Sequence, residues 1–164
     1  GIKNKIKPII FGGGQEGGVR SGTLPAPLCI GLGAACKLLQ QEMSEDQKVI
    51  EQQKDIFMSI ILEKVPFARL NGSLKNRIYN NLNICFAGVS SQDLLACIHD
   101  RVSASTGSAC TSGFIEPSHV LTAIGLPSNE IESSLRFGFG KGVDSEQIKL
   151  AANTIASEAN RLSN

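Results

Sequence analysis

Two short stretches alternate apolar side chains with polar or small ones: Leu82-Asn83-Ile84-Cys85-Phe86 and Leu135-Arg136-Phe137-Gly138-Phe139. Successive side chains of a β-strand point to opposite faces, so this period of two predicts two strands that each have one apolar face. Around them, apolar residues recur at helical spacing over about residues 26–65, 90–102 and 144–162. This order of helices and strands along the chain predicts an α/β fold, one sheet covered by helices.

The predicted helices carry signals at their ends. Ser90 suits an N-cap, and Asp144 with Gln147 has the spacing of a capping box. Pro117 suits the first turn of a short helix that has Gly125 near its C-terminus. These signals separate the helices from the loops between them.

Length and composition bound the class of protein. The chain has 164 residues, which is typical of one domain, and its 41% hydrophobic content suffices for a core. It carries 16 basic and 15 acidic residues, a net charge of +1, with no basic stripe, so nucleic acid is not an expected partner. No apolar run reaches the roughly 18 residues that a membrane span needs, so we expect no membrane partner either.

The five cysteines, Cys29, Cys36, Cys85, Cys97 and Cys110, show no C-x-x-C motif and no zinc-finger spacing. We therefore expect no metal site, and a reduced, cytoplasmic protein in which the first four thiols are mostly buried. Cys110 differs because its neighbours are small or hydroxyl-bearing, as in Ser108-Ala109-Cys110-Thr111-Ser112. Such a setting favours an exposed thiol, and reactivity requires an accessible thiolate.

Two further features are candidate binding sites. Arg136 stands alone among glycines on the polar face of its strand, where its planar fork suits a carboxylate; the alternatives are a structural salt bridge and a solvated edge of the sheet. The glycine-rich run 12–18 before Thr23 exposes backbone N–H groups that suit phosphate, although it lacks the phosphate-loop signature and a flexible connector is the alternative. An unrelated thiol enzyme with Cys110 as nucleophile and His119 as base also stays open.

Four stretches together resemble the C-terminal portion of cysteine desulfurases, which are pyridoxal-phosphate enzymes of the class V aminotransferase group. They are Gly12-Gly13-Gly14-Gln15-Glu16, Arg20-Ser21-Gly22-Thr23, Ser108-Ala109-Cys110-Thr111-Ser112 with Glu116-Pro117-Ser118, and Ser134-Leu135-Arg136-Phe137-Gly138. The resemblance covers about residues 9–162, and the third stretch is similar to the subgroup with a long cysteine loop. It implies a mainly antiparallel sheet covered by helices, as in the C-terminal domain of fold-type I pyridoxal-phosphate enzymes.

The resemblance also implies roles for three residues. Cys110 would be the catalytic nucleophile that takes the sulfur of L-cysteine as a persulfide and releases L-alanine. Arg136 would hold the substrate carboxylate, and Thr23 would reach the pyridoxal phosphate bound by the partner subunit of a homodimer. The sulfur would then pass to an acceptor protein, such as an iron–sulfur scaffold in iron–sulfur cluster assembly.

One family feature is missing from this sequence. The cofactor lysine of the family follows a histidine in a Ser-x-His-Lys context, and no lysine of this chain follows a histidine. We therefore expect residues 1–25 to be a glycine-rich loop segment from the large-domain, dimer-interface side of a longer enzyme, and residues 26–164 to be its C-terminal small domain, inactive alone. The alternatives are a non-catalytic module that carries a persulfide or docks an acceptor, and a selenocysteine lyase or aminotransferase relative.

Overall fold

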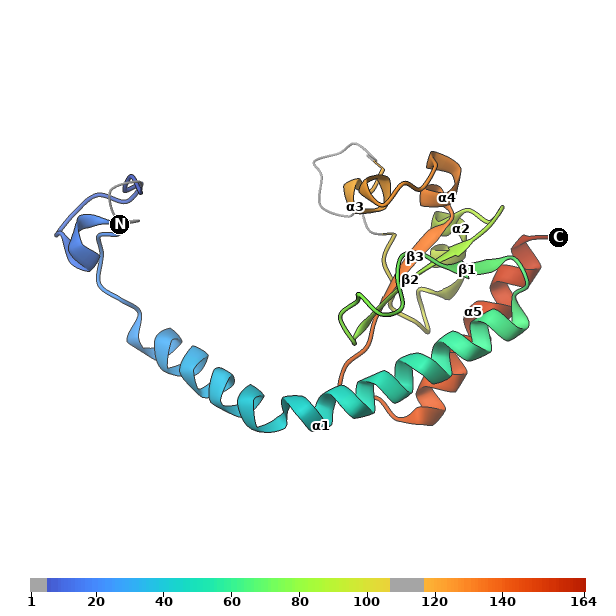
Figure 1. Cartoon of the computed structure of the whole chain (residues 1–164), viewed down its shortest axis with the longest axis horizontal. Coiled ribbons are helices and arrows are strands. Elements are labelled where there is room, and N and C mark those ends of the chain that lie inside the picture. Colours follow the sequence, from blue (N-terminus) through green and yellow to red (C-terminus); the bar gives the residue numbers. More distant parts are fainter. Residues whose placement is uncertain (1–5, 107–116) are drawn as a thin grey trace. The chain divides into compact units, whose positions relative to one another are not determined.

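The computed structural model describes residues 6–106 and 117–164. Its elements, in chain order, are the 3-10 helix η2 (Gln15–Gly18), α1 (Ala26–Lys64), β1 (Ala68–Leu70), β2 (Asn81–Phe86), α2 (Ser91–Ile98), α3 (His119–Ala123), α4 (Ser128–Glu132), β3 (Ser134–Gly138) and α5 (Ser145–Leu162) (Figure 1). The chain forms two compact units, an N-terminal unit up to Met43 and a C-terminal unit from Ser44, with the boundary inside α1. None of the described helices combines the length and apolar character needed to cross a membrane.

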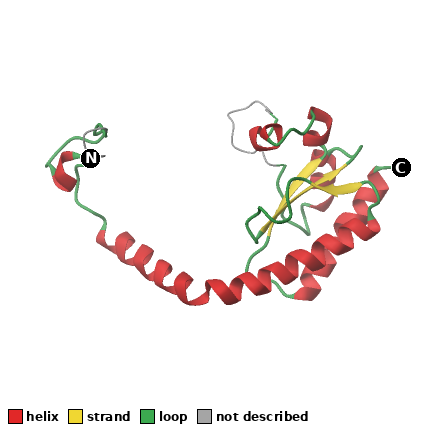
Figure 2. Ribbon diagram, viewed as in Figure 1, coloured by secondary structure: helices red, strands yellow, loops and turns green. Residues whose placement is uncertain are grey.

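The C-terminal unit is built on a three-stranded antiparallel sheet in the order β1-β2-β3 (Figure 2). In the central strand, Leu82 pairs with Phe137 and Ile84 pairs with Leu135, so the apolar residues of both predicted strands share one face. The predicted α/β architecture with a mainly antiparallel sheet is thereby confirmed. The strand β1 was not predicted, because three residues are too few to show a period of two.

The apolar face of the sheet packs against the C-terminal half of α1 and against α5, and the polar face lies toward α3 and α4 (Figure 1). Phe57 of α1 contacts the rings of Phe137 and Phe139, with centroids 4.9 and 5.4 Å apart. The core-facing residues of α5 are those that its helical spacing predicted: Ile148, Ala152, Ile155 and Ala159. Burial on this one face leaves the other face of the sheet available for polar side chains.

The predicted helix ends are largely as the sequence indicates. Asp144 accepts a hydrogen bond from the Gln147 N–H at 2.8 Å, and the Gln147 side chain accepts from the Asp144 N–H at 3.1 Å, which completes the capping box. The prediction for Pro117 was wrong by two residues. The Ser118 hydroxyl accepts from the Leu121 N–H and makes Ser118 the N-cap, so Pro117 precedes the helix.

In the N-terminal unit, the glycine-rich stretch forms η2 and a turn held by hydrogen bonds. Gly14 and Gly17 have φ values of 76° and 65°, a region that glycine adopts without strain. The Gln15 side chain accepts from the Gly22 N–H at 2.9 Å, and the Ser21 N–H donates to the Ile10 carbonyl at 3.3 Å. These hydrogen bonds give the run a defined local shape. A flexible connector would not need one.

The expected burial of the four cysteines is only partly met. Cys85 is buried and Cys97 is half-buried, whereas Cys29 and Cys36 in the first half of α1 are exposed. The described part of the N-terminal unit, residues 6–43, contains no strand and no second α-helix to cover that half of α1. The apolar pattern of a helix predicts which face of the helix packs. The pattern does not show which surface covers that face.

Candidate functional site

Arg136 on β3 marks the candidate site, because its backbone pairs with that of Ser105, which precedes Cys110 in the sequence. The Arg136 N–H donates to the Ser105 carbonyl at 2.7 Å, and the Ser105 N–H donates to the Arg136 carbonyl at 3.1 Å. Ser105 thus forms an isolated antiparallel bridge to β3. Cys110 lies outside the described residues, but the chain enters its segment from Thr106, directly after this bridge.

A pocket of about 420 Å³ opens over the polar face of the sheet. Its charged and amide-bearing lining residues include Asn71, Arg77, Asn81, Asn83, His119 and Arg136, and no aspartate or glutamate is among the described residues that line it. Arg136 is exposed, and among residues 6–106 and 117–164 no carboxylate forms an ion pair with it. The described structure therefore does not support the alternative of a structural salt bridge, and the guanidinium is open to an anion.

The second guanidinium of this pocket, that of Arg77, is used internally. Its Nε donates to the Ser73 carbonyl at 3.1 Å, its Nη1 to the Asn81 carbonyl at 3.3 Å, and its Nη2 to the Asn71 carbonyl. Burial lowers the pKa of the Arg77 guanidinium from its ordinary value. Arg77 therefore braces the loop between β1 and β2, and Arg136 is left to meet a ligand.

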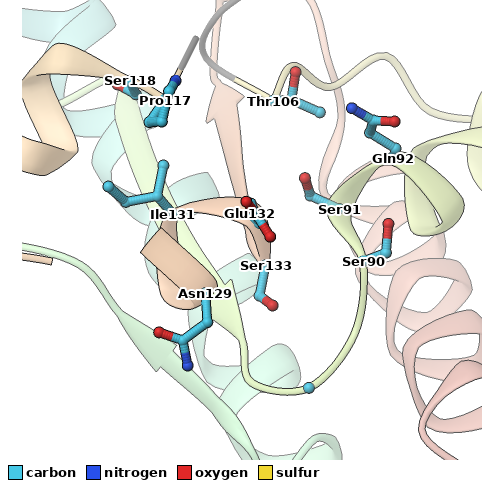
Figure 3. A pocket seen from close by; sticks show the side chains of 11 residues that line it. Ser90, Ser91, Gln92, Thr106, Pro117, Ser118, Asn129, Ile131, Glu132 and Ser133 are labelled. Atoms are coloured by element: carbon cyan, nitrogen blue, oxygen red, sulfur yellow. The ribbon is translucent and has the colours of Figure 1, made fainter. Parts of the chain in front are cut away.

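A neighbouring pocket of about 490 Å³ is lined mostly by hydroxyl, amide and carboxylate side chains (Figure 3). Thr106 and Pro117 line it, and these are the described residues on either side of the Cys110 segment. Glu132, at the end of α4, is the acidic residue of its described lining, and Ser118 lines both pockets. This second pocket therefore contains both residues that flank positions 107–116 in the sequence, and Ser118 links its lining to that of the first pocket.

The sequence-predicted site residues fall into three groups. Arg136 lies on the polar face of the sheet and lines the pocket there, and His119 at the start of α3 lines the same pocket. Cys110 lies outside the described residues. Thr23 is exposed in the N-terminal unit, directly after the glycine-rich turn, and the structure does not bring it together with Arg136.

Asn83 is a site residue that was not predicted. In the sequence it is the polar member of an alternating strand, yet in the structure it pairs with Arg136 across β2 and β3 and lines the same pocket. The alternation itself contained the signal, because it places Asn83 on the polar face of β2. What the sequence lacked was the register that brings the two residues together.

Pyridoxal phosphate, which the resemblance implies, needs a lysine that forms a Schiff base in a buried site. No lysine is among the described residues that line either pocket. Among the lysines that form ion pairs in the described residues, Lys54 has the least exposed side chain. Its Nζ lies 3.7 Å from the Asp55 Oδ1 on α1. The described residues thus fit the part of such a site that binds the substrate carboxylate and not the lysine anchor of the cofactor.

Comparison with known proteins agrees with this architecture. The aminotransferase class-V family model matches residues 3–150. The cysteine desulfurase IscS of Rickettsia typhi is 40% identical over 158 residues, which are 96% of this chain and 38% of that protein. A probable mitochondrial cysteine desulfurase of Dictyostelium discoideum is 41% identical, over 96% of this chain and 35% of that protein.

The fold is also found among solved structures. The X-ray structure of a NifS-like protein from Rickettsia africae superposes with a TM-score of 0.81 at 26% identity, over 94% of this chain and 40% of that one. The chain thus spans less than half the length of the curated relatives that it matches. Because the family model matches most of the sequence, the chain belongs to the aminotransferase class-V family.

Proposed function

We propose that this chain is the C-terminal part of a pyridoxal-phosphate-dependent cysteine desulfurase with a long cysteine loop. Its similarity to proteins named cysteine desulfurases, of which it spans 35–38%, supports this proposal. The absence of a lysine from the described lining of both pockets agrees with a cofactor anchor elsewhere in a longer enzyme. The observation that carries the proposal is the open Arg136 guanidinium beside the bridge at Ser105.

Arg136 would bind the α-carboxylate of L-cysteine. Its fork presents two parallel N–H donors, the geometry that a carboxylate accepts best. The described lining of the pocket contains no carboxylate that would compete for those donors. Arg77, the other arginine of this lining, donates to backbone carbonyls instead. The bound amino acid would therefore be held by its carboxylate, with its side chain free to meet a nucleophile.

Cys110 would supply that nucleophile. Its thiolate attacks the sulfur of L-cysteine, so a sulfur–sulfur bond forms and the carbon–sulfur bond of the substrate breaks. The electron pair of the broken bond stays with the carbon, which takes up a proton and leaves as L-alanine, while the sulfur remains on Cys110 as a persulfide. Pyridoxal phosphate supplies electron withdrawal in this class of reaction, and residues outside this chain would anchor it.

The N-terminal unit would serve a second active site. In this proposal residues 1–25 belong to the large-domain, dimer-interface side of the longer enzyme, and residues 26–164 form its small domain. The exposed Thr23, which follows a turn of defined shape, would reach the cofactor phosphate of the partner subunit in a homodimer. The persulfide would pass to an acceptor such as an iron–sulfur scaffold protein in the cytoplasm.

Two preparations test the proposal: the full-length enzyme that contains this chain, and the 164-residue chain alone. Each is mixed with pyridoxal phosphate and L-cysteine, and cofactor absorbance and L-alanine are measured. We expect the full-length enzyme to bind the cofactor and form alanine, and the chain alone to do neither. Alanine formation by the chain alone would overturn its assignment as a part. A cofactor-loaded full-length enzyme that makes no alanine would overturn the desulfurase assignment.

A further inference from the structure

Asn83 and Arg136 form a close cross-strand pair on the polar face of the sheet. They are register partners between β2 and β3. Both backbone groups of Arg136 bond to Ser105, so they point away from β2 and the pair is of the non-hydrogen-bonded type. In such pairs the Cα atoms approach to about 4.5 Å and the side chains lie closest together. The two side chains therefore emerge next to each other into the same pocket.

A chain of hydrogen bonds behind Asn83 fixes which way its amide points. The Glu130 carbonyl can only accept, so the Ser134 hydroxyl donates to it, at 2.6 Å. The Ser134 oxygen then accepts from the Asn71 Nδ2 at 2.8 Å, and the second Asn71 N–H donates to the Asn83 Oδ1 at 2.7 Å. Each bond sets the polarity of the next one, and together they leave the Asn83 Nδ2 as the outer end.

We call the hydrogen-bonded chain from Glu130 through Ser134 and Asn71 to Asn83 the amide relay. Its inner members are shielded from water. Asn71 is 5% exposed and Ser134 is 0% exposed, whereas Asn83 is half-buried at the pocket. Reversal of the Asn83 amide would bring its Nδ2 against the Asn71 Nδ2, two donors face to face, and would strip the Asn71 N–H of its acceptor. A buried donor without a partner is costly, so the orientation with Nδ2 outward is strongly favoured.

We propose that Asn83 is a substrate-binding residue that donates to the α-carboxylate of the substrate alongside Arg136. No described residue accepts a hydrogen bond from the Asn83 Nδ2, and the described lining of the pocket holds no competing carboxylate. The relay makes Asn83 a donor rather than an acceptor, and this polarity selects an anion. This inference rests on the proposed function, because it takes the occupant of the pocket to be an amino acid held by its carboxylate.

The test is Asn83→Asp in the full-length enzyme. The substitution keeps the side-chain shape and the acceptor for Asn71, but it replaces the outer donor with a negatively charged oxygen. Asn153→Asp is the matched control, because Asn153 is exposed on α5, lies outside the described lining of the pocket and takes the same change of charge. Asn83→Ala, which removes the donor without adding charge, covers the case in which the aspartate variant fails to fold.

We expect Asn83→Asp to raise the KM for L-cysteine at least about tenfold while kcat changes less than about twofold, because one charge-assisted hydrogen bond is lost and a repulsion is added. Asn83→Ala should raise KM by a smaller factor, and Asn153→Asp by less than about twofold. A KM for Asn83→Asp within about twofold of the parent, or equal effects of the two aspartate variants, would overturn the inference.

A second readout does not depend on the reaction. Sodium acetate, the simplest carboxylate probe, is titrated into the isotope-labelled 164-residue chain at constant ionic strength, and side-chain amide signals are followed by NMR. We expect the Asn83 Nδ2 signals to shift with saturation and those of Asn153 on α5 to stay in place. Unshifted Asn83 signals would overturn the inference even if the enzyme proves to be a desulfurase, whereas an inactive enzyme would refute only the proposed function.

Discussion

The backbones of Ser105 and Arg136 exchange two hydrogen bonds, of 2.7 and 3.1 Å. This bridge ties the chain just before the Cys110 segment to the strand that carries the open guanidinium. The edge of β3 therefore carries Arg136, which is proposed to bind the substrate, and pairs with Ser105, which precedes Cys110 in the sequence.

The bridge itself can be weakened by Ser105→Pro, which deletes the N–H that donates to Arg136. Loss of one backbone hydrogen bond, worth about 0.5–1.5 kcal/mol, loosens the start of the segment, whereas Arg136 stays paired with β2. In the full-length enzyme we expect kcat for alanine formation to fall about threefold to tenfold and KM to change less. Ser105→Ala, which keeps the N–H, is the control and should retain most of the activity; equal losses in both variants would contradict the role of the bridge.

Arg136→Lys keeps the charge and removes the planar fork. Because a bidentate pair becomes a single contact, we expect kcat/KM for L-cysteine to fall by a factor of about 10 to 100, mainly through KM. Arg101→Lys is the matched control, since Arg101 pairs with Asp100 and Glu158 on the surface of the C-terminal unit. Steady-state kinetics decide the matter: an unchanged KM in the Arg136 variant would mean that this arginine does not bind substrate.

The capping box at the start of α5 makes a stability prediction. Asp144→Ala removes the acceptor for the Gln147 N–H, and loss of an N-cap of this kind costs about 1 kcal/mol. We expect urea unfolding of the chain to show that decrease in the free energy of unfolding. Glu146→Ala, which removes only an exposed pair with Lys149, should change it by less than about half as much. The reverse order of the two effects would contradict the cap assignment.

Two adjacent residues of α1 separate the buried face of the helix from its exposed face. Ile61 is 0% exposed, whereas Leu62 is 41% exposed. Ile61→Ala should lower the free energy of unfolding by about 2–5 kcal/mol, through lost burial and the cavity that remains. Leu62→Ala should lower it by less than about 1 kcal/mol. Similar losses in urea unfolding of the two variants would contradict the packing of α1 against the sheet.

Local patterns carried much of the fold. The period of two gave β2 and β3, and the Asp144–Gln147 spacing gave the start of α5 to the residue. The strand β1 has three residues and the helix α4 has five, which is too short for a period of two or of 3.6 to be recognised. Contacts with the rest of the unit, rather than a local pattern, stabilise these two elements. Local periodicity therefore predicts the long elements and misses those that depend on tertiary contacts.

The candidate site was predictable only in part, for the same reason. The sequence pointed to Arg136 through its isolation on a polar strand face, and Arg136 lines the pocket on that face; its role in binding stays a prediction. The amide relay was beyond reach, because Asn71 and Ser134 meet across 63 positions of sequence and only the sheet register brings them together. Strand pairing, rather than residue type, turns an ordinary asparagine on a strand into a directed donor at Asn83.

The central claim is that Cys110 takes the sulfur from L-cysteine, and peptide mass spectrometry tests it most directly. The full-length enzyme is treated with L-cysteine in the absence of an acceptor, alkylated and digested, and the variants Cys110→Ala and Cys97→Ala are treated in the same way. Cys97→Ala is the control, because the Cys97 sulfur on α2 accepts a hydrogen bond from Arg161 on α5. We predict one additional sulfur atom on the Cys110 peptide in the parent and in Cys97→Ala, and none in Cys110→Ala, which should still bind the cofactor. Undiminished alanine formation by Cys110→Ala, or the extra sulfur on another cysteine, would contradict the account.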